Sequence, residues 1–450
     1  MKSLTFLFIL LLLCTEGWLI GSFVLRERNH ALLGALALPI AAVSNVLLIF
    51  LCTVFGIPLT ALLLLIGHIV IIVIALVLRQ KCSNLPSHSS PAIPIRRSRP
   101  LLIYRCICSV LLTIVFMFSA THALVLHSFS IDSFTNWTMR SRASFEDRAI
   151  ALDTTEERGV AKPQYPILVH SLQIMANQGG KWSDRAANAI TFLLSWTSLL
   201  AAFLLMRRLR GLDAALTTLT LVAGIPLIAI HLAQGYGDIH LTTYLILSLL
   251  SLALYDETSE RRWLVLSGIF TLAALWTKSE GIFFGFLPWA ALILIMARRK
   301  HTERECLTVI AVTFLIFLPF LLFLHGKGLG FTPHDSDNSL EWHPEGITAF
   351  FSALLRFGSL GATWYLAPSA LVLLACSPKH PAVQRSAFPF LLWGIAILLM
   401  NAMIYLCTPN IAFLINGQSF ARQMMPASAL LLTALVLMIR WENDVSRSKL

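Results

Sequence analysis

The chain has few charged residues. Only 13% of its 450 residues are Asp, Glu, Lys or Arg, whereas 57% are hydrophobic, and the mean hydropathy is +0.76. A soluble domain carries roughly 25% charged residues. This composition argues against a soluble enzyme or a nucleic-acid-binding module, and it predicts a polytopic membrane protein.

Several motifs of soluble enzymes are also missing. There is no Gly-rich phosphate loop of the dinucleotide or Walker type, so we expect no nucleotide pocket. The eight cysteines have no zinc-binding spacing. We assign no metal ligand and no certain cofactor, and the participation of a divalent cation (Mg²⁺ or Mn²⁺) is left open. The apolar pattern shows no strand signal and no internal repeat.

Long apolar runs are abundant. A spanning helix needs about 20 mostly apolar residues. The runs predict an all-α transmembrane bundle of about 13 helices, in which the short segments 263–277 and 281–297 form a broken or re-entrant pair. The candidates are 4–25, 31–52, 57–78, 101–121, 186–206, 212–231, 239–255, 263–277, 281–297, 306–325, 360–376, 387–406 and 424–440.

The net charge of +11 is explained by orientation. With the N-terminus outside and the C-terminus inside, every basic cluster between helices lies on the cytoplasmic face, as the positive-inside rule requires. Segment 1–78 then forms an accessory three-helix unit, and the Ser/Pro/Arg-rich segment 79–100 is a cytoplasmic linker. Segment 101–450 is the working core, with a long outer loop at 122–185.

Within the outer loop, residues 133–150 have the pattern of an amphipathic helix that lies on the membrane. Phe134, Trp137, Phe145 and Ala149 can share one stripe, and charged residues occupy the other faces.

Four polar fragments stand at helix mouths that this topology places on the outer side. They are 131–137 (IDSFTNW), Tyr165-Pro166, 236–238 (YGD) and 277–281 (TKSEG). Ionisable residues at membrane depth are costly, so they indicate function by default.

Asp132 can act as a general base for an acceptor hydroxyl, while Arg140 and Arg142 hold an anionic leaving group. The alternatives are an N-cap role for Asp132 and contacts of the two arginines with lipid headgroups. Lys278 and Glu280 interrupt two apolar segments, which favours a site or a buried structural pair.

These fragments resemble motifs of the C-type (GT-C) glycosyltransferase superfamily, in a group of bacterial membrane proteins. Segment 131–140 is similar to Asp-Ala-Leu-x-x-Trp-x-x-Lys-Ala-Lys, and 163–168 to Pro-x-Tyr-Pro-Pro-Leu. Segment 235–238 resembles Gly-Tyr-Ala-Asp, 277–281 resembles Thr-Lys-Asn-Glu-Gly, and 422–426 resembles Arg-x-x-x-Pro. The motifs occur in the expected order and leave out the first three helices.

The resemblance implies a GT-C-like enzyme of the bacterial inner (plasma) membrane. It would take a sugar from a polyprenyl-phosphate carrier and pass it to a lipid, glycan or protein acceptor at the periplasmic face. By motif position the catalytic base is Asp132. The implied donor-phosphate ligands are Arg140, Arg142, Lys278 and Arg422, and the implied substrate contacts are Trp137, Tyr165, Tyr236, Asp238 and Glu280.

The sequence departs from these motifs at some positions. Arg140 and Arg142 stand where the family has lysines, and Ser133 and Ser279 replace Ala and Asn, so the identity of the donor is open. The alternatives are a transporter or flippase of a lipid-linked or polar solute, an O-antigen-ligase-like glycan transferase, and a structural membrane subunit. A transporter or a ligase should tolerate Asp132→Asn.

Overall fold

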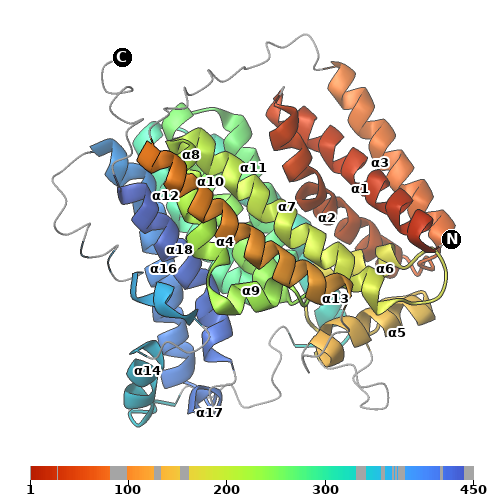
Figure 1. Ribbon diagram of the computed structural model, residues 1–450. Helices are drawn as coiled ribbons and strands as arrows, with labels where there is room; N and C mark the ends of the chain where they lie inside the picture. The colour runs from red at the N-terminus through yellow and green to blue at the C-terminus, as the bar shows by residue number, and fades with distance from the viewer. Residues whose placement is uncertain are drawn as a thin grey trace.

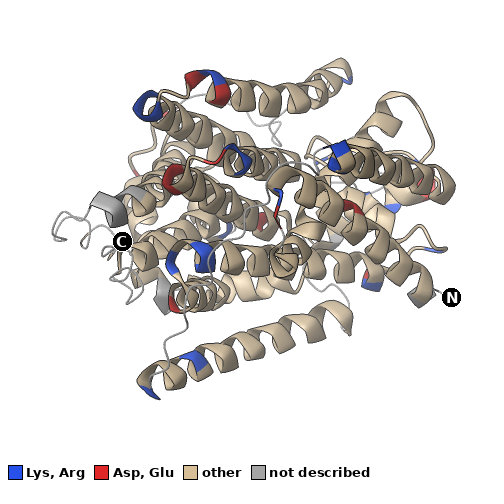
Figure 2. Cartoon of the chain, turned by 90° about the horizontal axis from the view of Figure 1, so that it is seen from above, with Lys and Arg blue, Asp and Glu red and all other residues tan. Residues whose placement is uncertain are grey.

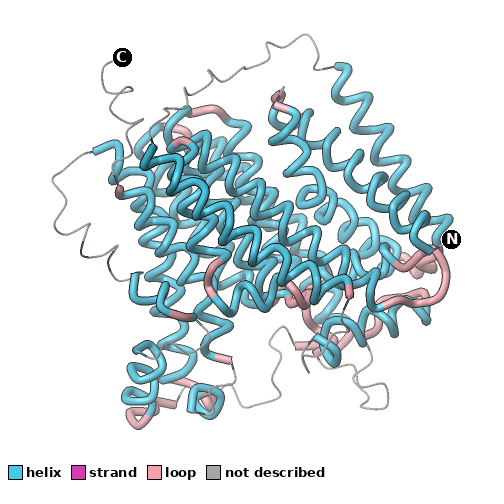
Figure 3. Tube along the Cα trace, in the orientation of Figure 1, coloured by secondary structure: helices cyan, strands magenta, loops and turns pink. Residues whose placement is uncertain are grey.

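The computed structural model describes residues 2–27, 29–81, 99–125, 133–152, 162–330, 341–355, 360–366, 369, 372, 381–415 and 419–439. Over these residues the chain is a bundle of helices without a regular strand (Figures 1 and 3), so the predicted all-α class is confirmed. Ten of the described helices are long and apolar enough to cross a membrane, or up to eleven if a bent pair counts as one span.

The accessory unit comprises α1 (Lys2–Leu25), α2 (His30–Val54) and α3 (Ala61–Lys81). The long loop holds a π-helical turn, η1 (Ser133–Thr138), followed by α5 (Met139–Asp147) and α6 (Leu168–Ala176). The other helices are α4 (Arg99–Leu124), α7 (Asp184–Arg210), α8 (Leu212–Ala223), α9 (Pro226–Leu232), α10 (Gly237–Thr258), α11 (Arg261–Thr277), η3 (Gly281–Phe286), α12 (Leu287–Lys300), α13 (Glu303–Gly326), α14 (Gly346–Leu355), η5 (Ala362–Tyr365), α16 (Pro381–Leu406), α17 (Ile411–Ile415) and α18 (Phe420–Met438).

The predicted count of 13 helices is not confirmed. The run 212–231 is two helices, α8 and α9, which meet at an angle of 83°. Pro226 begins α9 and lacks the N–H that a continuous helix would need, which accounts for the break. Much of the candidate 360–376 lies outside the described residues.

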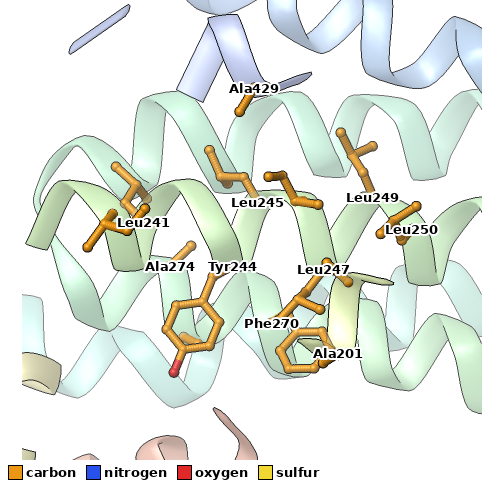
Figure 4. Close-up of a cluster of buried hydrophobic side chains, with 14 of the residues drawn as sticks. Ala201, Leu241, Tyr244, Leu245, Leu247, Leu249, Leu250, Phe270, Ala274 and Ala429 are labelled. Carbon is orange, nitrogen blue, oxygen red and sulfur yellow. The ribbon is translucent and has the colours of Figure 1, made fainter. Parts of the chain in front are cut away.

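The core of the bundle is α10. Every residue in its apolar window is buried, because α7, α11 and α18 pack around it. A helix that is apolar on all sides belongs in such a position. Figure 4 shows Leu245 and Leu249 of α10 among buried neighbours, which include Phe270 of α11 and Ala429 of α18.

The outermost helices have the opposite character. Only 17% of the apolar window of α3 and 6% of that of α4 is buried within the protein. Their exposed Leu and Ile side chains form apolar surfaces that water does not tolerate and lipid does. Figure 2 shows the basic residues of α4 at one end of that helix, which leaves the rest of it uncharged.

A buried polar chain joins the accessory unit to the core. Glu16 of α1 contacts His68 Nδ1 of α3 at 2.5 Å, and His68 Nε2 lies 3.2 Å from Asn45 Oδ1 of α2. Asn45 then donates to Ser171 Oγ of α6 at 2.9 Å. All four side chains are buried. Hydrogen bonds between buried polar groups fix how apolar helices dock, so this chain positions α6 relative to α1–α3.

Candidate active site

The third and fourth polar fragments meet around one ammonium group. Lys278 Nζ lies 2.8 Å from Asp238 Oδ1 and 2.9 Å from Glu280 Oε1. The three side chains are 10%, 5% and 18% exposed. Burial works against the charge, but Asp238 and Glu280 hold the pKa of Lys278 well above its usual range. The ammonium is therefore charged at any physiological pH.

A helix break presents these residues. The helix α11 ends at Thr277, Lys278 is extended (φ −155°, ψ 152°), and the chain resumes as η3 at Gly281. A Cβ on Gly281 would lie 2.2 Å from the carbonyl oxygen of Ala274, so only glycine allows the return. The break predicted between 263–277 and 281–297 is thus present. Asp238 lies in the first turn of α10, where the helix dipole favours a carboxylate.

Aromatic rings connect the first two fragments to the third. The Trp137 ring lies 5.9 Å from that of Tyr165 and stacks on His170 at 5.2 Å. A Cβ on Gly237 would lie only 2.2 Å from the Trp137 ring, which shows how closely this indole covers the start of α10. The Tyr165 ring in turn lies 5.9 Å from Lys278 Nζ. All four fragments therefore lie at the same end of the bundle.

This placement of Trp137 corrects the predicted aromatic stripe. Residues 133–147 are helical, but Trp137 is only 2% exposed and faces protein instead of lipid. The reason is that α5 forms hydrogen bonds with α6. Ser141 Oγ donates to Gln173 Oε1 at 2.5 Å and lies 2.9 Å from His170 Nδ1. The polar face of α5 is thereby satisfied inside the protein.

The two predicted phosphate ligands on α5 have different surroundings. Arg140 is fully buried and donates to the carbonyl oxygens of Ala151 at 3.2 Å and Tyr165 at 2.8 Å. Burial lowers the pKa of Arg140 to about 9, which leaves it charged at neutral pH. Arg142 is 55% exposed and pairs with Glu146, away from Lys278. The structure thus brings Arg140 to the site's edge and leaves Arg142 outside.

Arg422 and Tyr236 complete the described part of the site. The guanidinium carbon of Arg422, in the first turn of α18, lies 6.0 Å from the centre of the Tyr236 ring. Asp132 lies outside the described residues. Its neighbour Ser133 donates to the carbonyl oxygen of Gln234 at 2.8 Å, and Gln234 precedes Tyr236 by two residues.

Several buried polar atoms at this end have no hydrogen-bond partner among the described residues. They include Asp238 Oδ2, Glu280 Oε2, Ser279 Oγ, Gln423 Oε1 and both polar atoms of the Gln234 amide. Each such atom costs about 1–3 kcal/mol unless something else bonds to it. Gln234 and Gln423 were missed by the sequence analysis, although each is a polar residue beside a quoted motif.

Metal ligands are not grouped here. Among the described residues no set of three His, Cys, Asp or Glu side chains is placed to hold a metal ion. In the cluster, Lys278 supplies the positive charge between the two carboxylates.

Comparison with known proteins finds a family model that matches part of the chain and solved structures with a similar fold. Residues 163–323 match the family model described as dolichyl-phosphate-mannose-protein mannosyltransferase. No curated protein sequence matches the chain.

Solved structures show the same fold. The chain is similar to ArnT from Cupriavidus metallidurans in the apo state, with a TM-score of 0.54 and 16% identity over 78% of this chain and 62% of that one. It is also similar to ArnT from the same organism bound to undecaprenyl phosphate, with a TM-score of 0.51 and 16% identity over 75% and 60% of the two chains. The chain thus spans less than two thirds of the length of ArnT. These findings confirm the predicted resemblance to GT-C membrane glycosyltransferases and the predicted fold.

Proposed function

We propose that this protein is a glycosyltransferase that moves a sugar from a polyprenyl-phosphate carrier to an acceptor at the outer, periplasmic face of a bacterial inner membrane. The main observation is that Trp137, Tyr165, Asp238 and Lys278, from four fragments far apart in sequence, lie at one end of a fold like that of ArnT. The ArnT structure with undecaprenyl phosphate suggests the class of donor.

The unpaired carboxylate oxygens suit a sugar. Asp238 and Glu280 each give one oxygen to Lys278 and keep a second, buried oxygen without a partner. Sugar hydroxyls are hydrogen-bond donors that would satisfy both. Tyr165 and Trp137 border the same cluster and offer flat apolar surfaces for the C–H face of a sugar ring.

The cations suit a phosphate. Lys278 and Arg422 both act electrostatically on Asp238, in the first turn of α10. Two fixed charges in a site shielded from water stabilise the charge that develops on a leaving phosphate. Arg140 uses donors on backbone carbonyls, so in this proposal it mainly shapes the site, with one unpaired nitrogen, Nη2, left for a ligand.

Asp132 is the proposed base. It would accept the proton of the acceptor hydroxyl as that oxygen bonds to the anomeric carbon. The bond from that carbon to the phosphate oxygen breaks, and the polyprenyl phosphate leaves with the electron pair. One in-line displacement of this kind inverts the anomeric configuration. Ser133, the next residue in the chain, donates to the Gln234 carbonyl oxygen, close in sequence to the start of α10.

Sugar transfer in membranes tests the proposal. Labelled polyprenyl-phosphate sugars are supplied to membranes with the wild type, Asp132→Asn, or the control Asp147→Asn, whose carboxylate is exposed on α5. We expect transfer by the wild type and the control and at least a 100-fold loss for Asp132→Asn, since a general base contributes about 10²–10⁴-fold. Equal transfer by all three removes Asp132 from the chemistry, and absence of transfer in all three favours a transporter.

A further inference from the structure

Two cavities lie on the far side of α5 from Lys278, at a turn over residues 178–184. The first, of 850 Å³, is polar, and its lining includes Arg148, Lys181 and Trp182. The second, of 310 Å³, is mostly apolar, and its lining includes Phe6 of α1, Leu124 of α4 and Ala186 of α7. Gly180 and Lys181 line both cavities, so the two meet at this turn.

The polar cavity offers two unpaired cations. Arg142 pairs with Glu146 at 2.8 Å, and Asp184 accepts the indole N–H of Trp182 at 2.6 Å. Asp184 keeps its negative charge, so the lining holds three cations and two carboxylates. Arg148 and Lys181 are exposed and have no ion-pair partner among the described residues. A ligand with a phosphate would bind both, because charge-assisted bonds to phosphate are the strong ones.

The apolar cavity takes part of its lining from α1 and α4, which carry exposed large hydrophobics such as Leu4, at 73%, and Leu124, at 45%. Its lining also includes the cations Lys181 and Arg185. An acyl chain in this cavity would contact Phe6, Leu124 and Ala186. A protein site that places cations beside an apolar cavity can bind the anionic head group and an acyl chain of one lipid.

The accessory unit builds part of this place. The connection between α2 and α3 contributes Leu59, Thr60, Ala61 and Leu62 to the wall of the polar cavity. Its Leu59 N–H donates to the carbonyl oxygen of Arg148 at 2.7 Å, where Arg148 has the left-handed backbone (φ 55°) that ends α5. The accessory helices therefore hold Arg148 in place.

We propose that these cavities form a binding site for an anionic glycerophospholipid of the outer leaflet. Its phosphate lies between Arg148 and Lys181, and one acyl chain fills the apolar cavity. The site is separate from the Lys278 cluster and does not depend on sugar transfer. It gives α1–α3 a function, which is to complete a lipid site against the outer loop.

Lipid binding to the purified full chain in neutral detergent tests this site. Dibrominated phosphatidylglycerol and dibrominated phosphatidylcholine are titrated, and quenching of tryptophan fluorescence reports binding, with Trp182 in the cavity wall. The double variant Arg148→Gln/Lys181→Gln should bind phosphatidylglycerol about 30-fold more weakly, at roughly one factor of five per cation. Phosphatidylcholine should lose less affinity, because its choline cation offsets the charge of its phosphate. The control Arg298→Gln removes an exposed cation of α12 and should change neither.

Two further measurements distinguish a phospholipid site from a site for the donor lipid. Ala186→Phe fills the apolar cavity and should weaken both brominated lipids. Undecaprenyl phosphate, the other source of a phosphate on a long apolar chain, should bind the double variant as well as the wild type. The proposal fails if the double variant binds phosphatidylglycerol like the wild type, or if it loses undecaprenyl phosphate instead, which would assign the cavities to the donor.

Discussion

Replacement of Lys278 by Met removes the one ammonium that pairs with the carboxylates of Asp238 and Glu280. The ammonium lies 2.8 Å from Asp238 and 2.9 Å from Glu280, and its side chain is 10% exposed. Neither carboxylate has a second cation within ion-pair distance among the described residues. The variant therefore leaves two like charges close together and away from water.

Lys278→Met should lower the free energy of unfolding by a large amount. Removal of one partner from a buried ion pair destabilises a protein by about 3–5 kcal/mol. Here two carboxylates lose one partner, but Glu280 is 18% exposed and either acid can take up a proton, so we expect the same 3–5 kcal/mol instead of twice that value. The triple variant Lys278→Met/Asp238→Asn/Glu280→Gln, which removes every charge, should recover most of the loss.

The assay is the melting temperature of the detergent-solubilised protein, read from the monomer peak after heating. The matched control is Arg299→Met, because Arg299 pairs with Asp256 at the same 2.8 Å but is 49% exposed. Asp256 is 8% exposed but keeps Lys300 at 3.5 Å as a second partner. Loss of such a partly exposed pair should cost less than about 1 kcal/mol. If Lys278→Met melts no lower than Arg299→Met, then the ion pairs of Lys278 with Asp238 and Glu280 do not stabilise the protein as argued.

Two further predictions concern stability and the aromatic cover. His68→Ala should lower the melting temperature by an amount that corresponds to about 1–3 kcal/mol, because it leaves buried Glu16 without its hydrogen-bond partner on α3; unchanged melting contradicts the role of the polar chain. Gly237→Ala should displace the Trp137 ring and abolish sugar transfer. The control Gly34→Ala has nothing within 4 Å of the new Cβ, so it should melt no lower than the wild type and keep transfer. Equal transfer by both variants contradicts the close packing of Trp137 on Gly237.

The convergence of polar fragments was predictable from the sequence. Lys278 and Glu280 interrupt an apolar run, and charges at that depth persist only where they have partners or ligands. The same reasoning found Asp238 at a helix start. Because short connections return the chain to the same side after two crossings, helix mouths could be assigned to one face before any contact was known.

The roles of Arg140 and Arg142 could not be predicted in this way. They are two residues apart, and successive positions on an α-helix turn by 100°, so they face nearly opposite directions. Which direction is inside depends on α6, where His170 and Gln173 receive Ser141. That partner lies about 30 residues farther along the chain and carries no local signal in residues 133–150.

The bend between α8 and α9 is marked in the sequence by a glycine and a proline, although the hydropathy of the segment is continuous. Residues 212–231 form one apolar run, which predicts a single span. Gly224 and Pro226 within it are a helix end and a helix start. Because Pro226 cannot donate a backbone hydrogen bond, the predicted run 212–231 is a bent pair of helices.

Binding of undecaprenyl phosphate to the purified protein tests the central claim most directly. The claim is that the fragments around Lys278 form one pocket for a lipid phosphate, with Arg422 on its edge. We predict saturable binding by the wild type and by Arg298→Gln, and binding at least tenfold weaker by Arg422→Gln, as expected for loss of one charge-assisted contact of about 1.5–3 kcal/mol. Equal binding by Arg422→Gln and Arg298→Gln would contradict it.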